Sequence, residues 1–181
     1  MFRRLFGSKS RINRSITNAL YAEIVAAARQ PVLYSNWNAP DTPLGRFEMI
    51  ALHMFLFQHR MRDETGPRRE IAQILIDEFF SDVEHSLREL GIGDMGVPKR
   101  MKKFGRMFYG RTAAYADALE RDDSEALAAA LSRNIRPDSK DEWPESVDLA
   151  AYVIEAEKAL LAQDVSEIEA GKIRFPDLSG V

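Results

Sequence analysis

The stretch Pro43–Arg62, PLGRFEMIALHMFLFQHRMR, decides the fold. Wound as a helix, it places apolar residues on nearly every face, and a helix that is apolar all round has to be covered by other elements. Asp41 or Thr42 followed by Pro43 is a good helix start, because proline in the first turn loses no helical hydrogen bond. We therefore expect a nearly fully buried central helix from Leu44 to about Arg62.

Helical periodicity continues on both sides of this stretch, and no alternation of β-branched residues between hairpin turns indicates a strand. The sequence predicts an all-α fold, a single compact bundle of about six to seven helices. Residues 31–43 contain three prolines and should form an ordered connection held by Tyr34 and Trp37. The other expected helices run from a cap at Ser15 to about Arg29, from about Pro67 to Leu90 with Gly91 as C′ residue, from Pro98 to about Leu119, from a cap at Ser124 to about Asn134, from Pro144 or Ser146 to about Leu161, and over Asp164–Ala170.

Length and composition restrict the classes of protein to consider. A chain of 181 residues with 45% hydrophobic residues can form one domain without covalent cross-links, which we assign to residues 15–181, with an acidic C-terminal third. The absence of cysteine excludes disulfide frameworks and thiol nucleophiles, and it agrees with a reducing compartment, the cytoplasm by default. The N-terminus lacks the apolar run of a secretory signal, and the longest apolar run, Met49–Phe57, is too short to cross a bilayer.

Charge is distributed unevenly along the chain. The net charge is +5 over residues 1–30, +1 over residues 31–116 and −9 over residues 117–181, for a total of −3. The basic segment 1–14 interleaves cations with apolar residues, so we expect it either to contact an anionic membrane surface or to be a frayed, disordered tail. The residues assigned to membrane contact are Phe2, Arg3, Arg4, Leu5 and Phe6.

The stretch Leu87–Arg111, LRELGIGDMGVPKRMKKFGRMFYGR, joins a glycine-rich turn to a basic helix. Its glycines match the dinucleotide-binding pattern G-x-G-x-x-G, but that site needs a strand before the turn, and here a long helix leads in. We interpret the turn as a helix–helix corner, in which glycine permits positive φ and Asp94 is a candidate cap. Two residues of the central helix are expected to join it to this corner. The structural corner therefore comprises Gly91, Gly93, Asp94, Gly96, Pro98, Arg46 and Phe47.

The helix that begins at Pro98 carries cations on one side. Four of them follow the i, i+3, i+4, i+7 spacing of one helix face, and no acid stands between Asp94 and Asp117. Such a face suits an anionic or amphipathic partner, although an ordinary solvated face shows the same pattern. The expected client- or partner-binding residues are Lys99, Lys102, Lys103, Arg106, Phe108, Tyr109 and Arg111, and the residues that can face the core are Met101, Phe104, Phe108 and Tyr115.

No set of residues predicts an enzyme. Asp82-x-x-His85, with Glu78 one turn earlier, is half of a carboxylate-bridged metal site, and no second acid-x-x-His copy completes it. No G-x-S-x-G motif is present, and the histidines have no recognisable triad context. We therefore expect no catalytic residue, no metal site and no cofactor. The alternative to a protein-binding role is a ribosome- or RNA-binding module that uses the basic helix 98–119, because phosphates would bind the same cations.

The sequence also resembles a known family. The stretches Thr42–Met61 and Leu87–Phe104, and the motif FYGR at 108–111 followed by Tyr115 and Ala118-Leu119, resemble the ubiquinol–cytochrome c chaperone family in order and spacing, over about residues 20–135. The resemblance implies a helical, non-catalytic assembly factor that binds newly made cytochrome b and assists biogenesis of the ubiquinol–cytochrome c reductase (bc1) complex at the inner membrane.

The same resemblance implies the partners and the location. The expected partners are cytochrome b and an anionic membrane surface, with the ribosome as a further candidate because mitochondrial members act near its exit, and with no small-molecule substrate. The expected location is cytoplasmic and peripheral on the inner membrane. The lack of an evident long targeting extension favours a bacterial version.

Overall fold

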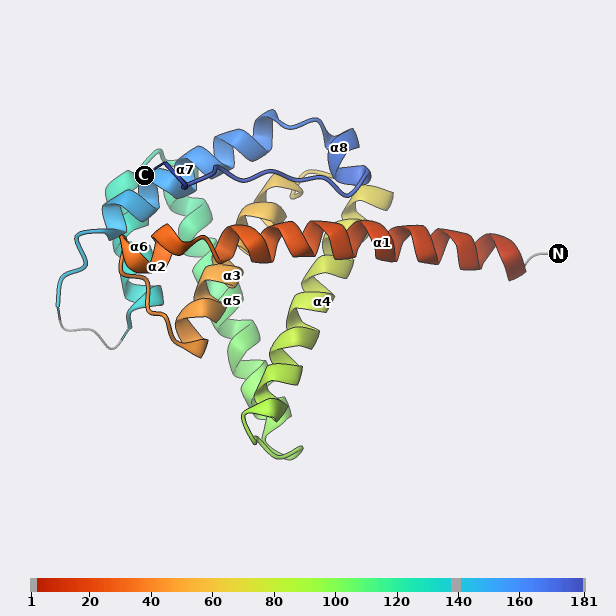
Figure 1. Ribbon diagram of the computed structural model, residues 1–181, viewed down its shortest axis with the longest axis horizontal. Helices are drawn as coiled ribbons and strands as arrows, with labels where there is room; N and C mark the ends of the chain where they lie inside the picture. The colour runs from red at the N-terminus through yellow and green to blue at the C-terminus, as the bar shows by residue number, and fades with distance from the viewer. Residues whose placement is uncertain (1–2, 138–140, 181) are drawn as a thin grey trace.

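The structure, a computed structural model, describes residues 3–137 and 141–180, with side chains from residue 14 onward. These ranges contain helices and no strand, so the all-α prediction is confirmed (Figure 1). Two of the helices, α2 and α8, are only five residues long, and the long ones build the body of the bundle. The helices are α1 (Arg3–Ala28), α2 (Pro31–Ser35), α3 (Pro43–Arg60), α4 (Pro67–Glu89), α5 (Val97–Glu120), α6 (Ser124–Ile135), α7 (Ser146–Ala162) and α8 (Val165–Glu169).

Helix α3 is the central helix, and it packs against α1, α4, α5, α6 and α7. It begins where the sequence predicted, because the Thr42 hydroxyl accepts a hydrogen bond from the Gly45 amide at 3.1 Å and Pro43 opens the first turn. A Cβ on Gly45 would lie 1.9 Å from the Pro40 carbonyl oxygen, so only glycine lets the preceding connection pass this close. Most side chains from Gly45 onward are buried, which confirms the predicted central helix.

Helix α1 begins at Arg3, well before the predicted start at Ser15. Ser15 lies inside the helix and caps nothing. The residues that precede it include one glycine and no proline, so nothing there stops a helix from continuing. The backbone is therefore helical across the boundary that we placed at residue 14. The side chains predicted to contact a membrane, those of Phe2, Arg3, Arg4, Leu5 and Phe6, lie outside the part of the chain that is described in atomic detail.

The connection between α1 and α3 is ordered, as predicted, and it also contains the short helix α2, which the sequence did not predict. Pro31 opens α2, because its fixed φ suits a first helical turn. The Tyr34 hydroxyl donates to the Ala28 carbonyl at 2.7 Å, and the Trp143 indole donates to the Trp37 carbonyl at 2.8 Å. The Trp37 ring is buried and lies 5.9 Å from the ring of Tyr152, so both predicted aromatic residues hold this connection against the bundle.

Helices α4 and α5 form a long hairpin whose tip points away from α1 (Figure 1). Gly91 has φ +79°, and the amides of Gly91 and Ile92 donate to the carbonyls of Arg88 and Leu87 at 2.9 and 3.2 Å. These two bonds make a Schellman ending, in which glycine adopts the left-handed conformation without strain. The prediction of Gly91 as the C′ residue of α4 is confirmed.

The start of α5 corrects one detail of the predicted corner. Gly96 precedes the first helical residue, Val97, and no side chain caps this end. Asp94 was a candidate cap, but its carboxylate lies 3.5 Å from the Arg88 guanidinium and turns toward α4. Pro98 lies in the first turn of α5, where its missing amide hydrogen costs no hydrogen bond.

Helices α6 and α7 pack against each other and close the bundle. Asp123, rather than Ser124, caps α6, and its carboxylate accepts a hydrogen bond from the Ala126 amide at 2.9 Å. A carboxylate at this position also gains from the positive end of the helix dipole, which explains why it replaces the predicted serine.

After α8, residues 172–178 run back along α1 and α7 without regular secondary structure (Figure 1). Two glutamines hold this strap. Gln30 donates to the Pro176 carbonyl at 3.1 Å and accepts from the Leu178 amide at 2.8 Å. Gln163 makes the same pair of bonds with the backbone of Arg174, at 2.7 and 2.9 Å. The Phe175 ring of the strap lies 5.2 Å from the His53 ring, so the strap covers part of the central helix.

Candidate partner-binding surfaces

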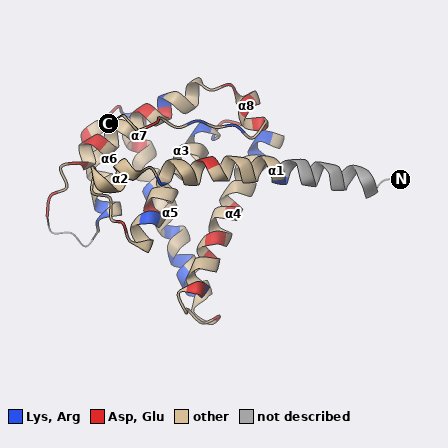
Figure 2. Ribbon diagram, viewed as in Figure 1, with Lys and Arg blue, Asp and Glu red and all other residues tan. Residues whose placement is uncertain are grey.

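The exposed side of α5 near the corner carries a group of cations (Figure 2). At about 100° per residue they occupy roughly half of the helix circumference. Among the described residues no carboxylate lies within 4.0 Å of any of them, so none is neutralised by an ion pair. Gly96 and four of these side chains line a cleft of about 350 Å³. The group, called here the cationic face, comprises Lys99, Arg100, Lys102, Lys103 and Arg106.

Tyr109 extends the cationic face, whereas Phe108 does not belong to it. Tyr109 is 61% exposed, but Phe108 is only 4% exposed and packs against the rings of Phe79 and Phe80, with centroids 5.5 and 5.7 Å away. Phe108 lies nine residues after Lys99, which turns it to the opposite side of α5. Its prediction as a contact residue is wrong, and only its placement toward the core holds.

Arg111 is also not part of the exposed cationic face. Its side chain is 11% exposed and forms an ion pair with Glu48 of α3, whose side chain is 3% exposed. Burial raises the pKa of Glu48, and the guanidinium of Arg111 partly lowers it again. The pair ties α5 to the central helix, so the arginine of the FYGR motif has a structural place in the fold and is not accessible for partner contact.

Of the two α3 residues predicted to contact the corner, Phe47 packs against the α4–α5 hairpin and Arg46 does not. The Phe47 ring lies 4.9 Å from Phe104 and 5.5 Å from Phe79, so it joins α3 to the α4–α5 hairpin above the corner. Arg46 instead turns to Asp41, at 2.6 Å, and remains exposed. The predicted link between Arg46 and the corner is therefore absent.

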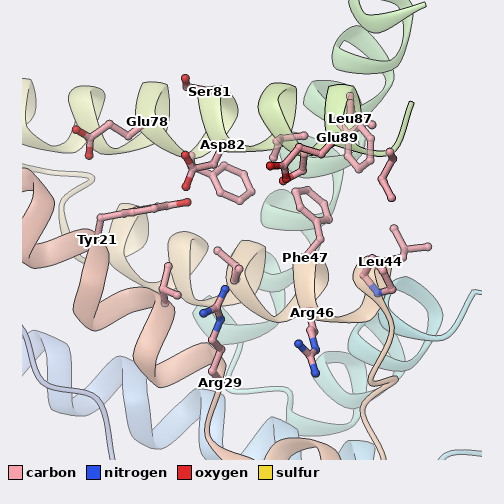
Figure 3. Close-up of a pocket in the computed structure, with 18 of the residues that line it drawn as sticks. Tyr21, Arg29, Leu44, Arg46, Phe47, Glu78, Ser81, Asp82, Leu87 and Glu89 are labelled. Atoms are coloured by element: carbon pink, nitrogen blue, oxygen red, sulfur yellow. The ribbon is translucent and has the colours of Figure 1, made fainter. Parts of the chain in front are cut away.

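A second surface, which the sequence did not predict, is a groove of about 1110 Å³ between α1, α3 and α4 (Figure 3). Its apolar floor comes from three helices. Val25 comes from α1, Phe47 and Ile50 from α3, and Leu87 from α4. A fourth helix, α5, adds Phe104 to this lining. The groove arises because α1 and α4 diverge on either side of α3, an arrangement in space that no local pattern encodes.

The two walls of the groove carry opposite charges. Glu78, Asp82 and Glu89 lie along α4, and Arg29 and Arg46 lie across from them (Figure 3). Burial raises the pKa of Tyr21, and the hydrogen bond that its hydroxyl donates to Asp82 raises it further. Burial and the neighbouring Asp82 raise the pKa of Glu78, although a hydrogen bond from Thr17 opposes them. In the sequence, Glu78 and Asp82 stood out only as part of an incomplete metal-site pattern.

Two histidines are buried in the core. His53 bonds through Nδ1 to the Met49 carbonyl at 2.7 Å and through Nε2 to the Tyr152 hydroxyl at 2.8 Å. Complete burial lowers the pKa of His53 to about 4, so the ring is neutral at physiological pH. His59 meets Glu157 at 3.0 Å, and burial lowers its pKa as well. Both histidines are satisfied by packing partners of the core.

The described residues contain no candidate metal cluster and no candidate membrane-spanning helix. In that part of the chain, no group of three or more histidine or acidic side chains is arranged to hold a metal ion. None of its helices combines the length and apolarity that crossing a bilayer requires.

The family to which this chain belongs follows from a comparison with known proteins. The model of the family described as Ubiquinol-cytochrome C chaperone matches residues 35–175, well over half of the chain. The chain belongs to this family. The match includes α3, the glycine corner and the cationic face, and it extends through α7 and α8 to residue 175, beyond the region of about residues 20–135 that carries the resemblance in sequence.

Two relatives of this chain are named ubiquinol–cytochrome c reductase complex assembly factor 1. The protein from Xenopus laevis is 26% identical over 102 residues, which cover 56% of this chain and 50% of the relative. The protein from Mus musculus is 27% identical over 141 residues, which cover 77% of this chain and 47% of the relative. The chain thus spans about half the length of the curated relatives it matches. Both are named as assembly factors rather than enzymes, as the sequence predicted for this chain.

A solved structure has the same fold over the whole length of this chaperone-family chain. The Cbp3 homolog from Brucella abortus superimposes with a TM-score of 0.91 at 52% identity, covering 100% of this chain and 99% of the other. None of these comparisons supports the alternative of a ribosome- or RNA-binding module.

Proposed function

We propose that this chain is an assembly chaperone of ubiquinol–cytochrome c reductase that binds newly made cytochrome b. The proposal extends family membership to a named client and to a location, the cytoplasmic surface of the inner membrane. It is supported by the names of the two assembly-factor relatives and by surfaces suited to holding a polypeptide rather than to turning over a substrate.

The observation that carries the proposal is the cationic face with its uncompensated charge. Five cations without ion-pair partners in the described chain cost free energy through mutual repulsion, so an ordinary solvated helix has no need to gather them. Tyr109 at its edge and the 96% exposed Met95 at the hairpin tip add aromatic and adaptable apolar contacts. Such a surface fits the acidic loops of an unfinished membrane protein and the anionic headgroups beside them.

The client assignment is tested by reversing charge on the cationic face. The triple variant Lys99→Glu, Lys102→Glu, Lys103→Glu and the wild type are tagged and purified from membranes of cells that make cytochrome b. We expect cytochrome b to co-purify with the wild type and to be lost from the variant, since opposite charge at three exposed positions repels what the lysines attract.

A matched variant controls for net charge. Arg69→Glu, Lys158→Glu, Lys172→Glu changes the total charge by the same amount at three exposed cations that also lack ion pairs in the described chain, away from the cationic face. This control should retain cytochrome b. Equal recovery of cytochrome b from a folded face variant would remove the cationic face from the client site.

A further inference from the structure

We propose that the groove between α1, α3 and α4 binds one amphipathic α-helix of a protein partner. The helix would lay an apolar face on the floor and direct lysines or arginines at the α4 wall. This surface is separate from the cationic face of α5, and the inference does not depend on cytochrome b being the client.

The size of the groove fits a helix better than a small molecule. Its volume of about 1110 Å³ exceeds the range of roughly 300–1,000 Å³ that is usual for small-molecule sites. The α4 wall runs from Glu78 to Leu90, which at about 1.5 Å per residue gives roughly 18 Å, or three to four helical turns. A segment of that length is the usual unit of helix-in-groove recognition.

The floor is apolar and rigid. Phe47 packs between Phe79 and Phe104, with centroids 5.5 and 4.9 Å away, so its ring is held at a fixed place. Leu44 and Leu90 continue the apolar surface at one end, and both are exposed. Exposed apolar surface that several elements build together marks an interaction site more often than scattered single residues do.

The charges on the groove walls determine which charges the flanks of the bound helix should carry. Glu78, Asp82 and Glu89 form no ion pair within 4.0 Å with a lysine or arginine of the described chain. Their hydrogen-bond or ion-pair partners are Thr17, Tyr21 and His85, and the charge of Arg14 acts on Glu78 from a greater distance. A row of carboxylates beside an apolar floor attracts a cationic flank.

The opposite wall of the groove is positively charged, so only one flank of the bound helix should be basic. Arg29 has no ion pair among the described residues, and Arg46 is held by Asp41. A helix with cations on both flanks would be repelled there, so the partner should be basic toward α4 and neutral or acidic toward α1. The cationic face of α5 would repel the same helix, and the two surfaces therefore select partners of opposite charge.

The test measures binding of two synthetic peptides to the full chain by fluorescence anisotropy. One is a helical peptide of about 14 residues, long enough for the groove, with leucine on one face and lysine on one flank, and the other has glutamate at the lysine positions. We expect the lysine peptide to bind at least about tenfold more tightly than the glutamate peptide. The double variant Asp82→Lys, Glu89→Lys should reverse this preference, because it inverts the charge of the α4 wall.

A blocking variant localises the binding. Ala22 is an exposed groove residue of α1, so Ala22→Trp fills the groove without removing a packed side chain. We expect this substitution to lower the affinity for the lysine peptide at least about tenfold. Ala151→Trp, at an exposed position of α7 outside the groove, should bind as the wild type does. Circular dichroism melting curves establish that each variant is folded.

Three results would overturn the inference. The first is unchanged binding by a folded Ala22→Trp variant, and the second is equal affinity for both peptides in the wild type and in the charge-reversed variant. The third concerns the occupant. If a peptide of residues 1–14 of this chain binds in the groove more tightly than the lysine peptide, the groove holds a second copy instead. None of these results bears on the capture of cytochrome b by the cationic face.

Discussion

Glu48 and Arg111 hold one negative and one positive charge in the interior between α3 and α5. Taking both out of water carries a desolvation cost that their attraction offsets only while both are present. Removing one partner leaves the other buried and unpaired, which typically costs about 3–5 kcal/mol. At the scale of single residues, this pair is where a small change should have a large effect on stability.

We predict that Arg111→Met lowers the free energy of unfolding by about 3 kcal/mol at pH 8, measured by urea denaturation. The loss should be smaller at pH 5, because burial raises the pKa of Glu48 and a protonated carboxyl needs no cationic partner. The double variant Arg111→Met, Glu48→Gln should recover part of the loss. A single variant that unfolds at the same urea concentration as the wild type would show that the pair does not stabilise the fold.

His53 gives a second prediction, for the dependence of stability on pH. Its pKa is about 4 in the folded chain and near 6.5 when unfolded, so between these values the unfolded chain binds the extra proton. Stability should therefore fall as pH drops below about 6.5, by up to roughly 3 kcal/mol near pH 4. His53→Gln removes this titration, and the wild-type loss between pH 7 and pH 4.5 should exceed the loss in the variant. Parallel curves would mean that His53 is not the titrating group.

At the scale of elements, the α4–α5 hairpin depends on Gly91. A side chain at φ +79° is strained, so we predict that Gly91→Ala lowers the free energy of unfolding by about 1 kcal/mol. Gly93 supplies the control, since its φ is not in the positive range and a Cβ there would meet no atom within 4 Å. Gly93→Ala should change the unfolding midpoint little or raise it slightly. Equal losses in both variants would contradict the Schellman geometry.

Local signals in the sequence predicted most of these elements. The all-round apolar stretch of α3, Pro43 at its start and Gly91 after α4 each act within a turn or two of the chain, and all three positions are confirmed. The cationic face was predictable for the same reason, because helical spacing alone decides which side of α5 the lysines share. Phe108 was misplaced although its angular position, opposite Lys99, already turns it away from the cations. Arg111 lies beside Arg100 by helical spacing, and only the packed fold pairs it with Glu48 of α3.

Features made by distant parts of the chain were not predictable in this way. The strap over residues 172–178 is held by Gln30, nearly the whole chain length away, through bonds to backbone groups that leave no pattern in composition. The groove depends on the angle between α1 and α4, and its lining residues read individually as ordinary positions of amphipathic helices. Only the packed arrangement reveals that their apolar sides lack a covering element.

At the scale of the whole molecule, charge is separated between surfaces. The cationic face occupies the outer side of α5, the carboxylates of the groove lie along α4, and the acidic C-terminal third builds α6 to α8 (Figure 2). Approach to an anionic bilayer is favoured when the cationic face turns toward it, because the acidic side is repelled. That orientation would leave the groove to the side, between α1 and α4, where a partner helix could enter it.

Binding of the protein to lipid vesicles tests this orientation. The protein should bind vesicles that contain anionic phospholipid and not purely zwitterionic vesicles, in a sedimentation assay at low salt, and binding should weaken at high ionic strength. Each cation near the surface contributes about 1 kcal/mol, so Lys99→Ala, Lys102→Ala, Lys103→Ala should weaken binding by roughly 100-fold. The variant Arg69→Ala, Lys158→Ala, Lys172→Ala has the same net charge and should bind nearly as the wild type does. If instead Arg3→Ala, Arg4→Ala abolishes binding and the face variant does not, the basic N-terminal segment rather than α5 contacts the membrane.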